Sequence, residues 1–211
     1  MKKGIIFDLD GTLWNATKQI ADFWKIFFQE KNIDITIDEH IMASEMGKLV
    51  EEIADDLLSH IAIPKRYELL NEACANELDY LLENHAVIYE GLEDTLKSLQ
   101  KEYTLCIVSN CQKGYIETFL ATSGLSDYFT DTENAQNTGL KKADNIKLVI
   151  KRNSLDKTYY VGDTLGDMKS SDEAGSIFIH AKYGFGKVSQ DRISINDIRD
   201  LPSFLEKEDN E

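Results

Sequence analysis

The chain has 211 residues, is 42% hydrophobic and 29% charged, and carries a formal net charge of -15 at pH 7. This size and composition are typical of a globular protein with one domain, or with one domain and a smaller insertion. The charge argues against nucleic acid or an anionic membrane as the main partner, because both require a cationic surface. An anionic substrate would need a bound cation and nearby lysines to offset the repulsion.

The N-terminal residues contain no apolar stretch long enough for a signal peptide or a membrane span. The cysteines, Cys74, Cys106 and Cys111, have scattered spacings that fit neither a metal site nor a disulfide framework. We therefore expect a cytoplasmic protein with reduced cysteines. We also expect a monomer or a homodimer.

The first predicted element is a strand at residues 3–8 that leads directly into two acids, in the sequence GIIFDLDGT. Asp8 and Asp10 occupy alternate positions and can converge at the carboxyl end of this strand. Gly11 then permits a sharp turn and a close approach of the backbone to a ligand. Such an acid pair indicates a nucleophile with a proton donor, and a hard metal ion that holds both acids.

Residues 16–83 have a helical pattern throughout, without a predicted strand. Apolar residues recur at steps of three and four, as in helices that bury one face: Ile20, Phe23, Trp24, Phe27 and Phe28, and later Leu70, Cys74, Leu78 and Leu81. Pro64 precedes the second of these runs and favours a helix start there. We interpret residues 16–85 as a small helical domain inserted into a core domain of residues 1–15 and 86–211.

Strands and helices alternate after Gly91. Strands are predicted at residues 103–108, 128–130, 158–161 and 177–179, and helices at residues 92–101, 115–122, 144–152 and 165–174. This alternation implies βαβ units. The predicted fold class is therefore α/β, a doubly wound, Rossmann-like parallel sheet with an inserted helical domain.

Three of the predicted strands end in polar residues: Asp8 and Asp10 after the first, Ser109 and Asn110 after the second, and Asp163 after a later one. Ligands of doubly wound sheets bind beyond the carboxyl ends of the strands, where the strand order reverses. The topology alone therefore predicts that these residues lie together.

Four ordered segments resemble the four motifs of the haloacid dehalogenase superfamily: Asp8-Leu9-Asp10-Gly11-Thr12, Ser109-Asn110, Lys142, and Gly162-Asp163-Thr164-Leu165-Gly166-Asp167. Each motif is short, but four in order at strand ends and in loops form a specific pattern. The resemblance covers residues 1–15 and 86 to about 200. The helical insertion resembles the type I cap of that superfamily, and Tyr183–Gly186 resembles a loop of its phosphoglycolate phosphatase-like members.

The resemblance implies a phosphatase that hydrolyses a small phosphate monoester of a metabolite. Asp8 is expected to attack phosphorus and to form an aspartyl-phosphate. Asp10 is expected to protonate the leaving oxygen and later to deprotonate water. Its presence favours a phosphatase over a dehalogenase, because a dehalogenase has no alcohol leaving group to protonate.

The resemblance also implies a Mg²⁺ site. Asp8 and Asp163 would hold the ion together with the backbone carbonyl of Asp10, and Asp167, four residues further on, would orient it through water. Hard oxygen ligands of this kind suit Mg²⁺.

The remaining motif residues are expected to bind the substrate phosphate: Gly11, Thr12, Ser109, Asn110 and Lys142. Many relatives have Lys-Pro at the third motif, whereas this chain has Gly139-Leu140-Lys141-Lys142-Ala143. The spacing from Gly139 favours Lys142, and Lys141 is the alternative.

Several interpretations stay open at this stage. A phosphomutase of the sugar-phosphate type and a non-catalytic phosphate-binding or interaction module are the alternatives to a phosphatase. Phosphoglycolate, sugar phosphates and nucleotide monophosphates all fit as substrates. Trp14 either contacts the substrate at the entrance or packs at a hinge, and hinges near residues 13–16 and 86–90 would let the cap open and close.

Overall fold

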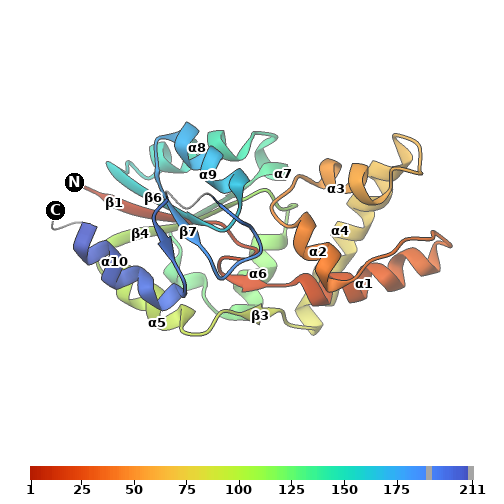
Figure 1. Ribbon diagram of the computed structural model, residues 1–211, viewed down its shortest axis with the longest axis horizontal. Helices are drawn as coiled ribbons and strands as arrows, with labels where there is room; N and C mark the ends of the chain where they lie inside the picture. Colours follow the sequence, from red (N-terminus) through yellow and green to blue (C-terminus); the bar gives the residue numbers. More distant parts are fainter. Residues whose placement is uncertain (189–191, 209–211) are drawn as a thin grey trace.

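Figure 1 shows the computed structural model of the chain, in which residues 1–188 and 192–208 are described. The strands are β1 (Lys3–Phe7), β2 (Trp14–Asn15), β3 (Val87–Ile88), β4 (Tyr103–Ser109), β5 (Asp131–Asn134), β6 (Lys157–Gly162), β7 (Ile177–Ala181) and β8 (Ser194–Ile195). The helices are α1 (Thr17–Glu30), α2 (Glu39–Glu45), α3 (Val50–Leu57), α4 (Lys65–Glu83), α5 (Leu92–Leu99), α6 (Tyr115–Ser123), α7 (Ala135–Thr138), α8 (Lys142–Arg152), α9 (Leu165–Ala174) and α10 (Leu201–Glu208).

Six strands form a parallel sheet in the order β5-β4-β1-β6-β7-β8. The next strand of this sheet after β1 in the chain is β4, which lies on one side of β1. The next strand after β6 is β7, which lies on the opposite side. The strand order therefore reverses between β1 and β6, which is where doubly wound sheets bind their ligands. The predicted α/β fold is confirmed.

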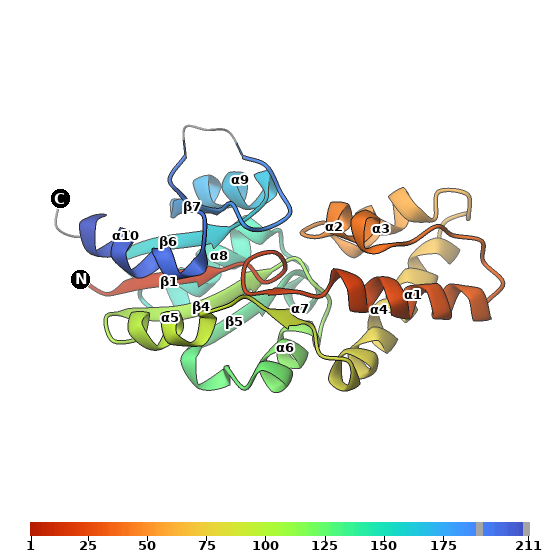
Figure 2. The same cartoon turned by 60° about the horizontal axis from the view of Figure 1, so that its bottom comes forward.

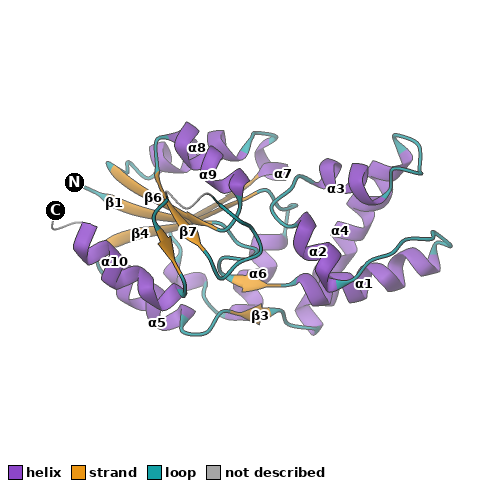
Figure 3. Ribbon diagram, viewed as in Figure 1, coloured by secondary structure: helices purple, strands orange, loops and turns teal. Residues whose placement is uncertain are grey.

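Helices cover both faces of this sheet (Figure 3). Side chains alternate between the two faces along each strand, so Ile5 and Phe7 of β1 pack in one hydrophobic cluster with residues of α5, α6 and α10. Ile6 packs on the opposite face against Ile146 and Val149 of α8. Burial on both faces explains why the strands of the sheet centre are almost continuously apolar.

Helices α1–α4 lie beyond the carboxyl ends of the central strands (Figures 1 and 2). Trp24, Phe27 and Phe28 of α1 are buried, as are Leu70 and Leu81 of α4, and they belong to one core cluster. The helical periodicity of this stretch is therefore confirmed. The boundaries of the two domains stay a prediction.

The predicted strand at residues 128–130 is wrong. Ser126–Tyr128 is a 3-10 helix, and the strand is β5, which pairs with β4 from Asp131 onward. The strand lies at the edge of the sheet and consists of polar residues, two of which bind Arg152. A polar edge strand has no apolar alternation, which is why the sequence did not reveal it.

The sequence also missed the short antiparallel pair of β2 and β3, as well as α7, β8 and α10. In that pair Trp14 lies opposite Ile88, and Asn15 lies opposite Val87. The two connections between the sheet and α1–α4 thus hydrogen-bond to each other at the predicted hinge positions. Across the part of the chain that is described, no helix is long and apolar enough to cross a membrane.

Candidate active site

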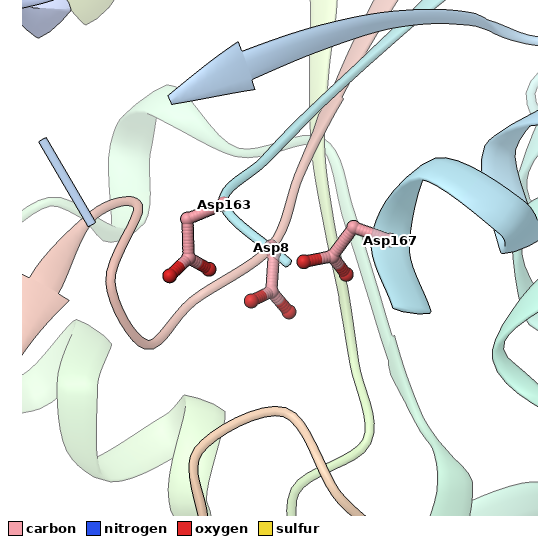
Figure 4. Close-up of side chains that lie close together, drawn as sticks. All are labelled: Asp8, Asp163 and Asp167. Atoms are coloured by element: carbon pink, nitrogen blue, oxygen red, sulfur yellow. The ribbon is translucent and has the colours of Figure 1, made fainter. Parts of the chain in front are cut away.

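Three carboxylates meet at the reversal point of the sheet. Asp8 follows β1, Asp163 follows β6, and Asp167 lies in the first turn of α9. Their side chains are buried and lie close together, with one oxygen from each within 4.8 Å of the others (Figure 4). Residues more than 150 positions apart are thus brought together as the topology predicted.

Hydrogen bonds to neighbouring residues hold two of these carboxylates in place. Asp167 Oδ2 accepts bonds from the backbone N–H of Thr164 (3.0 Å) and from its hydroxyl (2.7 Å), in a capping box at the start of α9. Asp163 Oδ2 accepts from the backbone N–H groups of Phe185 (2.6 Å) and Gly186 (3.1 Å). The Tyr183–Gly186 loop therefore positions Asp163.

Gly11 and Gly184 permit this close packing. Gly11 has a φ of 76°, and a Cβ at this position would lie 2.5 Å from Asp163 Oδ2. A Cβ at Gly184 would lie 2.3 Å from the Cβ of Asp163. Any larger residue at either position would therefore displace Asp163.

Lys142 is the lysine that reaches the acid cluster. Its Nζ lies 2.8 Å from Asp8 Oδ1 and 2.6 Å from Asp167 Oδ1, and the side chain is buried at the start of α8. Lys141 is exposed on the surface. Burial lowers the pKa of Lys142, but the carboxylates of Asp167 and Asp8 outweigh this and hold it well above its usual range.

Negative charge exceeds positive charge in the cluster. Burial, followed by the Asp167 carboxylate, raises the pKa of Asp8 to about 6 and that of Asp163 to about 8. Asp8 Oδ2 and Asp163 Oδ1 are buried and have no hydrogen-bond partner among the described residues. Two hard oxygens in this state fit a divalent cation such as Mg²⁺, which would satisfy both.

Asp10 is held by partners different from those of the other three acids. Its Oδ1 accepts hydrogen bonds from Trp14 Nε1 (3.0 Å) and from the Tyr115 hydroxyl (2.9 Å), and the residue is 7% exposed. Burial, and then the charge of Asp8, raises the pKa of Asp10 to about 7. A carboxyl with this pKa can carry a proton near neutrality, as a general acid must.

Trp14 is a packing residue. It is 1% exposed, and its ring makes edge contacts with Tyr115 and Phe119. The interpretation in which Trp14 contacts a substrate is therefore not supported. Tyr115 is the residue that sequence reasoning missed, because no local pattern reveals that its hydroxyl reaches a carboxylate 105 positions away.

The residues expected to bind phosphate lie at the same edge of the sheet. Ser109 is buried at the end of β4, and Asn110 Nδ2 donates a hydrogen bond to the carbonyl of Gly47, between α2 and α3 (2.9 Å). Gly11 and Thr12 lie in the turn after Asp10, and the Thr12 hydroxyl is buried with no partner among the described residues. Neither Gly11 nor Thr12 lines the cavities described next.

Among the cavities between the sheet edge and α1–α4, two border Asp10 or Lys142. An open cleft of about 650 Å³ is lined by Asn110, Lys142 and Thr164 on one side and by Met46 and Lys48 on the other. A smaller, more apolar cavity lies against Asp10, Ser109 and Tyr115 and extends toward α1 and α4. Asp10 therefore lines the smaller cavity, and Lys142 lines the cleft.

Glu77 of α4 is buried and lines the smaller cavity. Its carboxyl accepts hydrogen bonds from Trp24 Nε1 (2.5 Å) and from Gln112 Nε2, and it is 2% exposed. Burial raises the pKa of Glu77 to about 8.

We expect Glu77 to make the protein less stable as the pH rises. The folded protein keeps the Glu77 proton up to a pH of about 8, whereas the unfolded chain loses it near 4.5. Between these values the folded state binds more protons, so the free energy of unfolding falls by about 1.4 kcal/mol per pH unit from this group. Urea unfolding at pH 5 and pH 8 should show a smaller pH dependence for Glu77→Gln than for the wild type. An unchanged difference between the two pH values would contradict a buried, protonated Glu77.

A family model described as haloacid dehalogenase-like hydrolase matches residues 5–181. The chain is 26% identical over 188 residues to the putative HAD-hydrolase YfnB of Bacillus subtilis. The matched region covers 81% of this chain and 80% of the relative. It is 24% identical over 204 residues to a phosphoglycolate phosphatase of Vibrio vulnificus, at 87% and 85% coverage.

Solved structures share the fold at lower identity. A predicted phosphoglycolate phosphatase from Haemophilus somnus superposes with a TM-score of 0.83 at 19% identity, covering 97% of this chain and 98% of that one. A beta-phosphoglucomutase from Clostridium difficile superposes with a TM-score of 0.78 at 16% identity, covering 100% and 98%. These likenesses extend over the sheet and α1–α4 alike.

Proposed function

The chain belongs to the haloacid dehalogenase-like hydrolases, and on that premise we propose that it is a Mg²⁺-dependent phosphatase that hydrolyses a small phosphate monoester. The proposal rests above all on the position of Asp10. This carboxyl lies two residues from Asp8, is oriented by Trp14 and Tyr115, and faces a cavity. A proton donor at this place suits a leaving alcohol.

In the first step the carboxylate of Asp8 attacks phosphorus, and the bond between phosphorus and the ester oxygen breaks. The Asp10 carboxyl gives its proton to the departing oxygen, which leaves as an alcohol. In the second step Asp10 takes a proton from water, which attacks the aspartyl-phosphate. Phosphate leaves, and the carboxylate of Asp8 is restored.

The surrounding residues orient these groups and balance their charge. Lys142 holds Asp8 by an ion pair and lies close to where a phosphate would bind. Ser109, Asn110 and the backbone at Gly11 and Thr12 are proposed to bind the phosphoryl oxygens. Asp8, Asp163 and the carbonyl of Asp10 would hold Mg²⁺, and Asp167 would orient it; the bound ion would supply positive charge that offsets the charges of the nucleophile and the phosphate.

Phosphate release from a panel of small monoesters tests the proposal. With Mg²⁺ present, the wild type is expected to hydrolyse at least one ester faster than Asp8→Asn, and a chelator should stop this reaction. If the wild type releases no phosphate above the variant from any ester, the proposal is wrong. A bisphosphate-dependent isomerisation without release would instead identify a phosphomutase.

We further expect Asp163→Asn to weaken Mg²⁺ binding by at least about 100-fold, because it replaces a charged ligand that lies opposite Asp8. Titration calorimetry measures this directly, and the Mg²⁺-induced rise of the melting temperature gives a second readout. Asp172→Asn is the control, since Asp172 is exposed on α9 and pairs with Arg192. Wild-type affinity in Asp163→Asn would argue against the proposed metal site.

A further inference from the structure

The small cavity beside Asp10 limits the size of the group that leaves. If Asp10 protonates the leaving oxygen, as the proposed function requires, the alcohol part of the substrate must lie in this cavity. The space open to the centre of a water molecule there is about 40 Å³. This is room for about three waters, so the alcohol has only about three or four non-hydrogen atoms.

Most of the cavity wall is apolar. The side chains that α1–α4 and the loops between them contribute include Ile20, Trp24, Met42, Val50, Ile53 and Cys74. Such walls exclude water and offer no hydrogen bonds to an ionised group. A charge that enters this cavity therefore loses its hydration and must be compensated by protein groups.

The titratable groups of the cavity are predominantly acidic. Besides Asp10 they include Glu77 and Glu45, which are 2% and 5% exposed. Lys48 is the one basic residue among the described residues of the lining. Its Nζ is already bound by Glu45 Oε2 (2.9 Å) and by Asp56 Oδ2 (2.7 Å). The cavity thus offers no uncommitted cation to a carboxylate or a second phosphate.

Hydrogen-bond donors fit the same cavity well. Each oxygen of Glu77 accepts one hydrogen bond, from Trp24 and from Gln112. With its proton bound, the Glu77 carboxyl still keeps acceptor capacity for a further donor. A hydroxyl group on the alcohol can supply that donor, and an ammonium group can replace the proton that burial holds on Glu77 and pair with the carboxylate that results.

We propose that the substrate is the phosphate monoester of a compact alcohol that carries no second anionic group and whose polar part donates hydrogen bonds to Glu77. This inference rests on the proposed phosphatase function and narrows its substrate class. It separates the chain from enzymes that act on phosphoglycolate, whose alcohol carries a carboxylate.

Three esters on the same two-carbon frame test the proposal: phosphoglycolate, 2-hydroxyethyl phosphate and phosphoethanolamine. They are similar in size and differ in the charge of the group beyond the alcohol carbon. We expect kcat/KM for phosphoglycolate to be at least about 100-fold below that of the better of the other two, because its carboxylate is buried without a cation. Equal or faster hydrolysis of phosphoglycolate overturns the proposal.

A binding experiment keeps this test separate from the test of catalysis. The affinities of the three esters for Asp8→Asn, measured by calorimetry with Mg²⁺ present, should follow the same order. If no ester is hydrolysed but the order of binding holds, the phosphatase proposal fails while the selectivity of the cavity stands. If phosphoglycolate binds most tightly, the selectivity is wrong whatever the catalytic result.

Glu77→Gln tests whether Glu77 binds the polar part of the substrate in the cavity. The amide keeps the shape of the side chain but, unlike the Glu77 carboxyl, cannot give up a proton to pair with an ammonium group, so kcat/KM for phosphoethanolamine should fall by at least about tenfold relative to 2-hydroxyethyl phosphate. Glu83→Gln is the matched control, because Glu83 is exposed on the same helix. An unchanged ratio in Glu77→Gln, in a variant that melts like the wild type at pH 5, would remove Glu77 from the proposal.

Discussion

Replacement of Asp8 by Asn is expected to lower the rate of phosphate release by at least about 10⁴-fold. The amide removes the nucleophile, and the remaining groups cannot form an aspartyl-phosphate. The fold should persist, because Asp8 is buried in a cluster with an excess of negative charge, which the substitution reduces. Steady-state phosphate release with the best ester of the panel measures the effect.

The covalent intermediate gives a second readout for Asp8. Wild-type protein mixed with substrate and quenched in acid should contain a peptide with a phosphate on Asp8, which mass spectrometry detects. The control for the charge change is Asp172→Asn, which should keep wild-type activity because Asp172 lies on the surface. Substantial activity in Asp8→Asn, or a phosphate on another residue, would show that Asp8 is not the nucleophile.

Lys142→Met is expected to lower both stability and activity, whereas Lys141→Met should change neither by much. The Lys142 ammonium lies between the buried carboxylates of Asp8 and Asp167. Loss of a partner from a buried ion pair leaves charge uncompensated and costs about 3 kcal/mol or more of the free energy of unfolding. Loss of a cation beside the reacting phosphate should also lower kcat by about 10³-fold.

The neighbouring lysines form a matched pair, because each substitution removes one positive charge from adjacent positions. Urea unfolding of the metal-free protein measures the stability difference, and Lys141→Met should lie within about 0.5 kcal/mol of the wild type. Phosphate release measures the activity. A larger effect at Lys141 than at Lys142 would contradict the role assigned to Lys142.

The edge of the sheet shows where sequence reasoning fails. Periodicity identifies strands only when one or both of their faces are apolar, and the polar residues of β5 satisfy neither condition. Periodicity also does not reveal the pair of β2 and β3, because each strand has two residues and depends on a partner more than 70 positions away. Such elements depend on their neighbours rather than on their own pattern.

The sequence by itself determined the alternating α/β fold, the helical insertion and the acids Asp8, Asp10 and Asp163. These are local features, since a strand, its turn and the acid that follows it lie within about ten residues. Only the tertiary structure decided that Lys142 reaches Asp8, that Tyr115 and Trp14 hold the Asp10 carboxyl, and that Glu77 faces the cavity. These arrangements depend on contacts between distant segments, which no local pattern encodes.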